Sequence, residues 1–304
     1  MTVKGILVTM LVPMENHIAN GGEKLLGNAS SIKRRPDGKV YISGQMQRHV
    51  LFSAMDRLNE DDSHKGETYI SNGDGIGNAI ELDIRADLGG FMHPNKGDYS
   101  GRRIAPLSVT PAVALEPSEI GRDLMLRLST MDRNNAVATR EFSQGDMMHM
   151  NFSLDVGMVG VSKVFHYHDN FSFGSSYIQH IGLEEKLRRT KLFIDSTRMM
   201  NDYANQARNA VSGEPQQVLI VFDTKLSRKA ARYFVAGENE KQNILEELDA
   251  REAKYFAGND ISGEMSVSQA YESALSFLNS ENLYNPCPPE SEIKTFAEAF
   301  ETEK

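Results

Sequence analysis

Three consecutive cations are the first candidates for chemistry in this sequence. Lys33, Arg34 and Arg35 precede the turn sequence of residues 36–38, Pro-Asp-Gly, so residues 32–42 are predicted to form a short hairpin. Three adjacent side chains on a hairpin cannot all point into the core, so at least two should face solvent or a ligand. Composition leaves two equal alternatives, a phosphate-binding site or a solvated basic hairpin.

A helix should begin directly after this hairpin. Ser43 is a suitable N-cap, and apolar residues then recur at every fourth position from Met46 to Leu58, which predicts one buried helix face. Backbone N–H groups at a helix start attract anions. Together with Gln45 and Arg48, they would form a phosphate site beside the basic hairpin.

A second segment repeats this chemistry. Asn205, Arg208 and Asn209 are followed by Gly213, between a predicted helix and a predicted central strand. Amide and guanidinium groups commonly donate hydrogen bonds to phosphate oxygens. These polar residues are therefore further candidate contacts for a nucleic-acid backbone.

No signature of a common enzyme or metal site occurs in the sequence. The glycines of residues 72–78 lack the Gly-Lys-Ser/Thr ending of a P-loop, which favours a flexible turn. His166 and His168 could form a metal pair, but no third ligand lies at suitable spacing, which favours an exposed hairpin. The single cysteine, Cys287, excludes a disulfide framework. We therefore predict no catalytic residue, no metal and no cofactor.

Charge is distributed unevenly along the chain. The 304 residues have a formal net charge of -9, which taken alone would argue against a nucleic-acid partner. Residues 238–304 hold 15 acidic and 5 basic residues, a net of -10, so residues 1–237 have a net charge of +1. Local clusters of cations determine phosphate binding more than the net charge does. The sequence therefore permits a nucleic-acid partner for the first 237 residues.

The order of predicted elements indicates an α+β fold with a ferredoxin-like core, because it matches the split βαβ arrangement. Polar segments at 59–104 and 129–146 are interpreted as loops inserted into this core. The expected core elements are a strand at 3–12, a helix from Ser43, extended segments at 104–115, 124–128 and 148–156, a helix at 183–203 and a strand at 217–222.

The acidic C-terminal segment is predicted to be helical. Ile244, Leu248 and Tyr255 would share one helix face, and Ser266 with Gln269 would form a capping box. No apolar run approaches the roughly 20 residues that span a bilayer, and no cleavage site follows the first apolar segment. We therefore expect a cytoplasmic protein with no membrane partner.

Several segments in this order resemble a known family, the DevR-type "Cas seven" family. Its members are backbone subunits of type I CRISPR surveillance (Cascade) complexes, and the resemblance is closest to the I-B-like type. It covers about residues 1–235 and does not extend to the acidic segment. The segments that carry it are the first strand with its Asn-rich loop, 40–51 (VYISGQMQRHVL), 86–92 (ADLGGFM), 103–117 (RIAPLSVTPAVALEP), 151–160 (NFSLDVGMVG) and 205–222.

The resemblance implies a right-hand architecture. Residues 1–237 would form a palm like that of RNA-recognition motifs, with fingers at about 59–104 and a thumb at about 129–147. Residues 238–304 would be a helical extension. The strand at 149–155 lacks the aromatic pattern of RNA-recognition motifs, so RNA would be held by its phosphates rather than by stacking on the sheet.

The resemblance also implies a function without catalysis. Copies would polymerise head to tail along a CRISPR RNA, contact other Cascade subunits, and present the guide for pairing with target DNA. A metal-dependent ribonuclease, using an aspartate of segment 59–104 or 129–147, is the alternative. Under the resemblance the contacts to RNA would be Lys33, Arg34, Arg35, Ser43, Gln45, Arg48, His49, Asn205, Arg208 and Asn209, with Met131 or Phe142 as a thumb wedge between bases.

Overall fold

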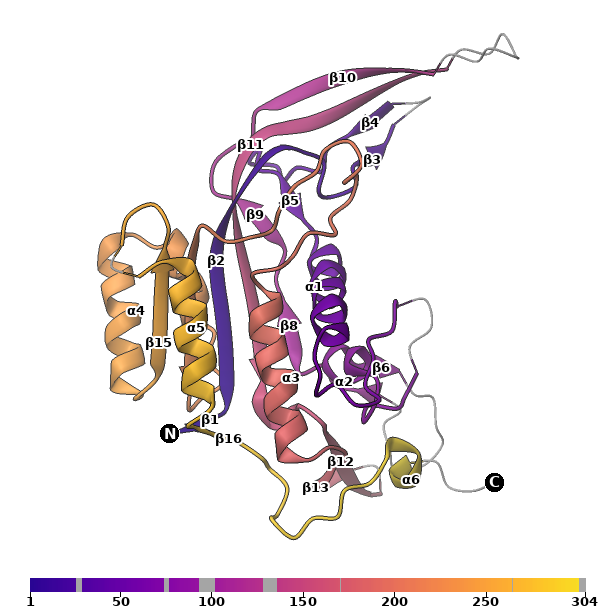
Figure 1. The fold of residues 1–304 in the computed structure, drawn as a ribbon, viewed down its shortest axis with the longest axis vertical. Helices are drawn as coiled ribbons and strands as arrows, with labels where there is room; N and C mark the ends of the chain where they lie inside the picture. The colour runs from indigo at the N-terminus through magenta and orange to yellow at the C-terminus, as the bar shows by residue number, and fades with distance from the viewer. Residues whose placement is uncertain are drawn as a thin grey trace.

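A central antiparallel sheet organises the molecule (Figure 1). The computed structural model describes residues 1–25, 29–73, 77–92, 102–127, 136–169, 171–263 and 265–300. Four neighbouring strands of the sheet lie in the order β15-β14-β2-β11, with β15 at one edge. They are β2 (Gly5–His17), β11 (Ala136–Asp155), β14 (Gln217–Asp223) and β15 (Lys254–Asn259).

Strand β2 is buried on both faces. Its residues 5–12 are all buried, as expected when layers cover both sides of a sheet. Ile6, Val8 and Met10 belong to the main core cluster, whereas Leu7 lies in a second cluster on the opposite face. This alternation follows from the two-residue period of a strand.

Helices form a layer on each face of the sheet. The main core cluster includes residues of three helices, α1 (Gly44–Glu60), α3 (Leu183–Ser196) and α5 (Val267–Leu278). On the other face, the 3₁₀ segment η2 (Lys229–Val235) and α4 (Glu238–Ala250) pack against Leu7 and its neighbours. Helix α3 ends at Ser196, earlier than the predicted 203.

The sequence prediction for β11 is right for one half of the strand and wrong for the other. The predicted apolar side, residues 148–156, is buried at every second position from Met148 to Val156. The described part of the predicted loop, residues 136–147, is the first half of β11 instead. It pairs with β10 (Ile120–Arg127) to form the arm that leaves the body of the molecule (Figure 1). The extended segment predicted at 124–128 is confirmed as far as residue 127, as part of β10. Both sides of the arm meet solvent over much of its length, so the β11 half of the arm lacks the alternation that identifies a half-buried strand.

Shorter elements complete the sheet and its edges. The extended segments predicted at 104–115 are confirmed as two strands that pair with β11. These two strands are β8 (Leu107–Val109) and β9 (Ala112–Ala114). The other short elements are β5 (Tyr41–Ile42), β3 (Glu23–Lys24), β4 (Ala29–Ser31), β1 (Thr2–Val3), β16 (Asn282–Leu283), α2 (Ile84–Gly89), β6 (Phe91–Met92), β7 (Arg102–Arg103), η1 (Val156–Met158), β12 (Val161–His168), β13 (Phe171–Gln179) and α6 (Phe296–Phe300).

The acidic C-terminal segment takes part in the central fold. Strand β15 pairs with β14 at the sheet edge, α5 packs in one helical layer and α4 in the other. The predicted capping box of Ser266 and Gln269 is confirmed, as is the burial of Ile244 and Leu248. Tyr255 does not continue that helix face, because it lies in β15.

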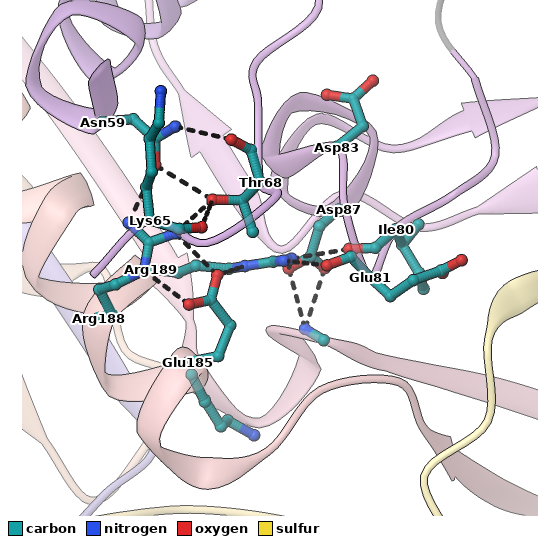
Figure 2. A network of polar contacts seen from close by, with 12 residues as sticks. Asn59, Lys65, Thr68, Ile80, Glu81, Asp83, Asp87, Glu185, Arg188 and Arg189 are labelled. Carbon is teal, nitrogen blue, oxygen red and sulfur yellow. Dashed lines mark hydrogen bonds and ion pairs between the residues drawn. The ribbon is translucent and has the colours of Figure 1, made fainter. Parts of the chain in front are cut away.

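A buried carboxylate joins the segment after α1 to the core (Figure 2). The Asp87 carboxylate in α2 accepts hydrogen bonds from Arg103 at 2.5 Å and Arg189 at 2.8 Å. It also accepts the backbone N–H of Gly160 at 2.9 Å. Burial alone would raise the pKa of Asp87, but the two guanidinium charges and the Gly160 bond lower it. The charged carboxylate is therefore the stable form in the core.

A third arginine, Arg188, extends this network to the end of α1 (Figure 2). Arg188 donates to Asn59 and Asp62 at 2.9 Å and to the Thr68 hydroxyl at 2.8 Å. It also forms a bidentate pair with Glu185, one turn earlier in α3. The segment that follows α1, polar in sequence, is thus fixed to α3 by charged groups, while its Ile84 and Leu88 join the main core cluster.

In the part of the chain that the structure describes, no helix combines the length and apolar character needed to cross a membrane.

Candidate nucleic-acid interface

The predicted basic hairpin lies at the base of the arm. Arg34 and Val40 form an isolated antiparallel bridge, and the Arg35 N–H donates to the Lys39 carbonyl at 2.9 Å. The turn is closed by Gly38, whose φ of 81° suits glycine. Arg34 and Arg35 remain exposed, and Lys33 is half-buried. The prediction of a hairpin with at least two outward cations is therefore confirmed.

An open hollow of about 430 Å³ adjoins the two exposed arginines. It is lined by Glu23, Ile32, Arg34, Arg35, Pro36 and Gly38. Arg34 approaches Glu141 only at 3.9 Å, and Arg35 approaches Asp37 at 3.6 Å. Exposed ion pairs at these distances are weak, so a phosphate could compete for either guanidinium.

A buried amide holds this hairpin in place. The Asn20 side chain donates to the carbonyls of Lys33 and Tyr41, both at 3.1 Å, and accepts the Gly22 N–H at 2.9 Å. Both ends of the hairpin are thereby tied to the loop after β2. Asn20 bears no charge, so it can affect binding only by positioning the cations.

Replacing Asn20 with alanine should weaken RNA binding about tenfold while leaving its salt dependence unchanged. The carbonyls of Lys33 and Tyr41 lose the Asn20 donor and the hairpin loosens, but the number of cations that meet phosphates stays the same. Titration of a labelled single-stranded RNA at several salt concentrations measures both quantities. A changed salt slope in this variant would mean that Asn20 does more than position the hairpin.

The second predicted segment also lies at the base of the arm. Asn205 adopts a left-handed φ of 64° and donates through its amide to the Ile18 carbonyl at 3.2 Å. Asn209 donates to the Asn16 carbonyl at 2.8 Å. Arg208 is exposed and directs one guanidinium nitrogen toward the Met125 sulfur of β10, at 3.5 Å. The two amides are therefore used to fix the loop, which leaves Arg208 as its exposed cation.

Two successive residues of β11 connect the arm to both basic segments. Arg140 donates to the Asn205 side-chain oxygen at 3.2 Å. Its neighbour Glu141 accepts the Ile32 N–H at 3.3 Å and contacts Arg34. Successive side chains of a strand point to opposite faces, so the two segments meet β11 on alternate sides. We call Lys33, Arg34, Arg35, Asn205, Arg208 and Asn209 together the junction cluster.

The first turn of α1 continues from the hairpin. Ser43 is the N-cap, as predicted, and its hydroxyl accepts the Met46 N–H at 3.2 Å. Gln45 and His49 are both exposed, and their spacing of four residues places them on one face of the helix. These two side chains are available to a ligand, while the Ser43 hydroxyl already serves the helix.

Arg48 points away from the hairpin. Its guanidinium donates to the Gly89 carbonyl at the end of α2 and lies 5.6 Å from the Phe52 ring centroid. Burial, and then the charge of Arg85, lower the pKa of Arg48. The structure therefore places Arg48 between α1 and α2, apart from the junction cluster that the other cations form.

Of the two residues predicted as thumb wedges, the structure describes Phe142. Met131 lies outside the described residues. Phe142 lies in β11 and is half-buried, with its ring so close to Gly121 of β10 that a Cβ at that position would lie 2.3 Å from it. This placement favours a packing role for Phe142 inside the arm.

Sequence reasoning missed the residues that hold the interface together. Asn20, Arg140 and Glu141 carry no motif, and the last two lie in the segment expected to be a loop. Arg122 of β10 was also missed; it is exposed and contacts Glu141 at 3.2 Å. Pairing of β10 with β11 would have placed Arg122 opposite Glu141, but residues 136–147 have no apolar alternation and were therefore not recognised as the partner strand.

The histidine pair lies elsewhere, in the exposed hairpin of β12 and β13, as the sequence favoured. Residue ranges that the structure describes hold no group of three or more His, Cys, Asp or Glu side chains arranged for a metal ion.

Comparison with known proteins gives a match in fold. No family model matches the sequence, and no curated protein matches it. Among solved structures, a chain of a "CRISPR RNA-guided surveillance complex" aligns with a TM-score of 0.54 at 12% identity, over 90% of this chain and 99% of that one. A chain of a "CRISPR RNA-guided surveillance complex, pre-nicking" aligns with a TM-score of 0.58 at 11% identity, over the same shares of the two chains. At such low identity the match demonstrates a shared fold: this chain is folded, over nine tenths of its length, like chains of RNA-guided surveillance complexes.

Proposed function

We propose that this chain is a CRISPR RNA-binding backbone subunit of a type I Cascade surveillance complex of the DevR-type "Cas seven" family. Copies polymerise head to tail along the guide RNA in the cytoplasm, beside other Cascade subunits. The bases of the guide then pair with target DNA in antiviral defence. Head-to-tail contacts that do not close into a ring produce such open helical assemblies.

One observation carries the proposal. Two segments about 170 residues apart in the chain, which carry the exposed cations Arg34, Arg35 and Arg208, are hydrogen-bonded to successive residues of the same strand at the base of a projecting arm. The surrounding fold is like that of chains in RNA-guided complexes. A cluster of cations without aromatic side chains suits a nucleic-acid backbone, which is bound through its phosphates whatever its sequence.

The topology supports a palm like that of RNA-recognition motifs. Strands β14, β2 and β11 are neighbours, and β9 pairs on the far side of β11. Helices α1 and α3 pack on one face of this sheet. The split βαβ fold has the same order, with its first and third strands at the centre. In the proposal the arm of β10 and β11 is the thumb, and the segment with α2 belongs to the fingers.

Purification tests both the binding and the lack of catalysis. The full chain, expressed with a CRISPR RNA, should elute with RNA that ribonuclease removes and that stays intact when Mg²⁺ or Mn²⁺ is added. Elution without RNA would contradict the binding proposal. Cleavage of paired RNA at regular spacing, abolished by one Asp→Ala change, would instead establish the ribonuclease alternative.

A further inference from the structure

A buried carboxylate lies in β11 where the arm leaves the sheet. The Asp146 side chain is only 2% exposed. On the side away from β2, the neighbour of β11 changes here from β9 to β10. Leu115, just after β9, donates its N–H to the Met147 carbonyl. Glu119, just before β10, accepts the Gln144 N–H. Asp146 therefore lies at the point where the arm begins.

Both oxygens of this carboxylate are hydrogen-bonded. Oδ2 lies 2.7 Å from Nε2 of His17, at the end of β2, and Oδ1 accepts the Ser118 hydroxyl. The Ala19 N–H donates to His17 Nδ1 at 3.4 Å, so the proton of a neutral ring is on Nε2 and faces Asp146. Burial alone would raise the pKa of Asp146, but the bonds from His17 and Ser118 lower it. The carboxylate is therefore charged and accepts from both neighbours.

Ser118 extends this network to the basic hairpin. Its hydroxyl oxygen accepts the Val40 N–H at 3.0 Å, and its own N–H donates to the Gly38 carbonyl at 3.2 Å. At the other end of the network, Ala19 directly precedes Asn20, whose amide also holds the hairpin. The network thus connects three parts of the interface: the basic hairpin, the loop after β2 and the arm.

The order of the three side chains differs from that of a nucleophilic triad. In such a triad a histidine lies between the serine and the acid and takes the serine proton. Here Asp146 lies between Ser118 and His17, so the serine hydroxyl donates to a carboxylate instead of to an imidazole. This arrangement suits a group that holds segments in place.

We propose that Asp146 is a positioning residue for RNA binding, whose carboxylate sets the angle between the arm and the basic hairpin. The inference rests on the proposed function, because it names the residue that orients Arg34 and Arg35 relative to the arm in the same interface. Removal of the carboxylate releases Ser118 and the Val40 N–H that Ser118 accepts. The two arginines then remain on the hairpin but meet the phosphates of a bound strand in a wider range of positions.

The direction of the effect separates positioning from electrostatics. Asp146 carries a negative charge near the cations that would meet phosphates. If its charge alone mattered, every neutral replacement would strengthen RNA binding by the same amount. If its hydrogen bonds position the hairpin, the result depends on whether the replacement can still form them, and loss of the bonds weakens binding although a negative charge is removed.

Two replacements of Asp146 test this difference by titration of labelled single-stranded RNA. Asp146→Ala removes both acceptors and should weaken binding about tenfold, as for a lost hydrogen bond to a charged group. The salt slope should stay the same, because the number of phosphate contacts is unchanged. Asp146→Asn keeps the size, and its amide can accept from His17 and donate to the Ser118 oxygen. Binding by this variant should stay within about threefold of the unchanged chain. Equal affinities for the two variants would overturn the proposal.

A buried carboxylate near the other end of β2 supplies the matched control. Asp223 of β14 lies opposite Gly5 and forms an ion pair with Arg251 at 2.9 Å. Asp223→Ala makes the same chemical change as Asp146→Ala, and it should lower the midpoint of urea unfolding without weakening RNA binding. Equal weakening of binding by both alanine variants would contradict the proposal, because a general loss of stability would then explain both.

The angle itself can be measured without RNA. Leu124 of the arm is 66% exposed and Pro36 of the hairpin is also exposed, so Leu124→Cys and Pro36→Cys can carry spin labels in a Cys287→Ser background. Double electron–electron resonance should give one narrow distance for the labelled chain and for its Asp146→Asn form. The Asp146→Ala form should give a broader or shifted distribution. The same distribution in all three would overturn the proposal.

A milder variant keeps the test decisive if Asp146→Ala does not fold. Ser118→Ala removes the link to the hairpin and leaves the buried contact of Asp146 with His17. It should also broaden the distance distribution, and an unchanged distribution in this variant would count against the proposal in the same way. A chain that binds no RNA at all would contradict the proposed function, whereas the distance measurement would still decide whether Asp146 fixes the arm and the hairpin.

Discussion

Replacing Asp87 with asparagine should lower the free energy of unfolding by about 3 to 5 kcal/mol, the cost of breaking a buried ion pair by removing one partner. Asp87 is fully buried, as are Arg103 and Arg189. Asparagine has nearly the same shape, but it removes the carboxylate that pairs with the buried Arg103 and leaves Arg189 with Glu185 as its remaining ion-pair partner. Urea unfolding followed by far-ultraviolet circular dichroism measures the loss as a lower midpoint.

A matched variant separates this effect from the loss of any carboxylate. Asp56→Asn makes the same chemical change on an exposed residue of α1, and it should alter stability by less than about 0.5 kcal/mol. Equal stabilities for the Asp87 and Asp56 variants would contradict a structural role for the buried network.

The same network predicts a loss of stability in acid. The pKa of Asp87 is lowered in the folded state, so its contribution is fully present above the unfolded pKa of about 3.9. That contribution is lost as the pH falls below about 4, through the folded pKa. Asp87→Asn should therefore show a shallower acid dependence of stability than the unchanged chain.

Replacing Lys33, Arg34 and Arg35 with alanine should weaken binding of single-stranded RNA at least about tenfold at low salt. Each phosphate contact contributes about 0.7 to the slope of log affinity against log salt concentration on single strands, so three lost contacts reduce that slope by about 2. Fluorescence anisotropy with a labelled RNA over a range of salt concentrations measures both effects.

The control for this triple variant has the same change in net charge. Lys229, Arg232 and Lys241 are basic residues of η2 and α4, and they pair with Glu247, Glu240 and Glu238 on the other side of the sheet. Their replacement with alanine should leave the slope unchanged. Equal loss of affinity in both variants would mean that only net charge matters and that the hairpin is a solvated basic surface.

The parts of the fold that the sequence predicted are those with local signals. Ser43 caps α1 and the apolar half of β11 is buried, because N-cap chemistry and two-residue alternation act between near neighbours. The polar half of β11 and the strand β15 were not predicted. Their pairing depends on partners distant in the chain, and solvent on the arm removes the alternation that would have identified a strand.

The candidate site shows the same contrast between local signals, which the sequence reveals, and contacts between distant segments, which it does not. The cations of the hairpin and Arg208 were found from residue type, and their segments meet β11 on alternate sides at the base of the arm. The residues that bring them together, Asn20 and Arg140, act through single hydrogen bonds to segments that only the folded chain places beside them. Arg48 illustrates the converse: its position in the sequence suggested a phosphate contact, whereas its side chain bonds to α2.

The structure shows where the acidic segment that dominates the net charge of -9 lies in the fold. The acidic C-terminal segment supplies β15 at the sheet edge and one helix to each layer. The exposed cations of the junction cluster gather at the base of the arm instead. The overall charge therefore does not describe the surface that would meet RNA.

Crosslinking of the chain to guide RNA tests the central claim most directly. Ultraviolet irradiation of the purified complex, followed by mass spectrometry of RNA-linked peptides, should identify peptides that contain residues 33–49 and 205–209. The triple variant of Lys33, Arg34 and Arg35 should lose most of the first set. Crosslinks found only on other surfaces, with neither of these peptides among them, would contradict the account.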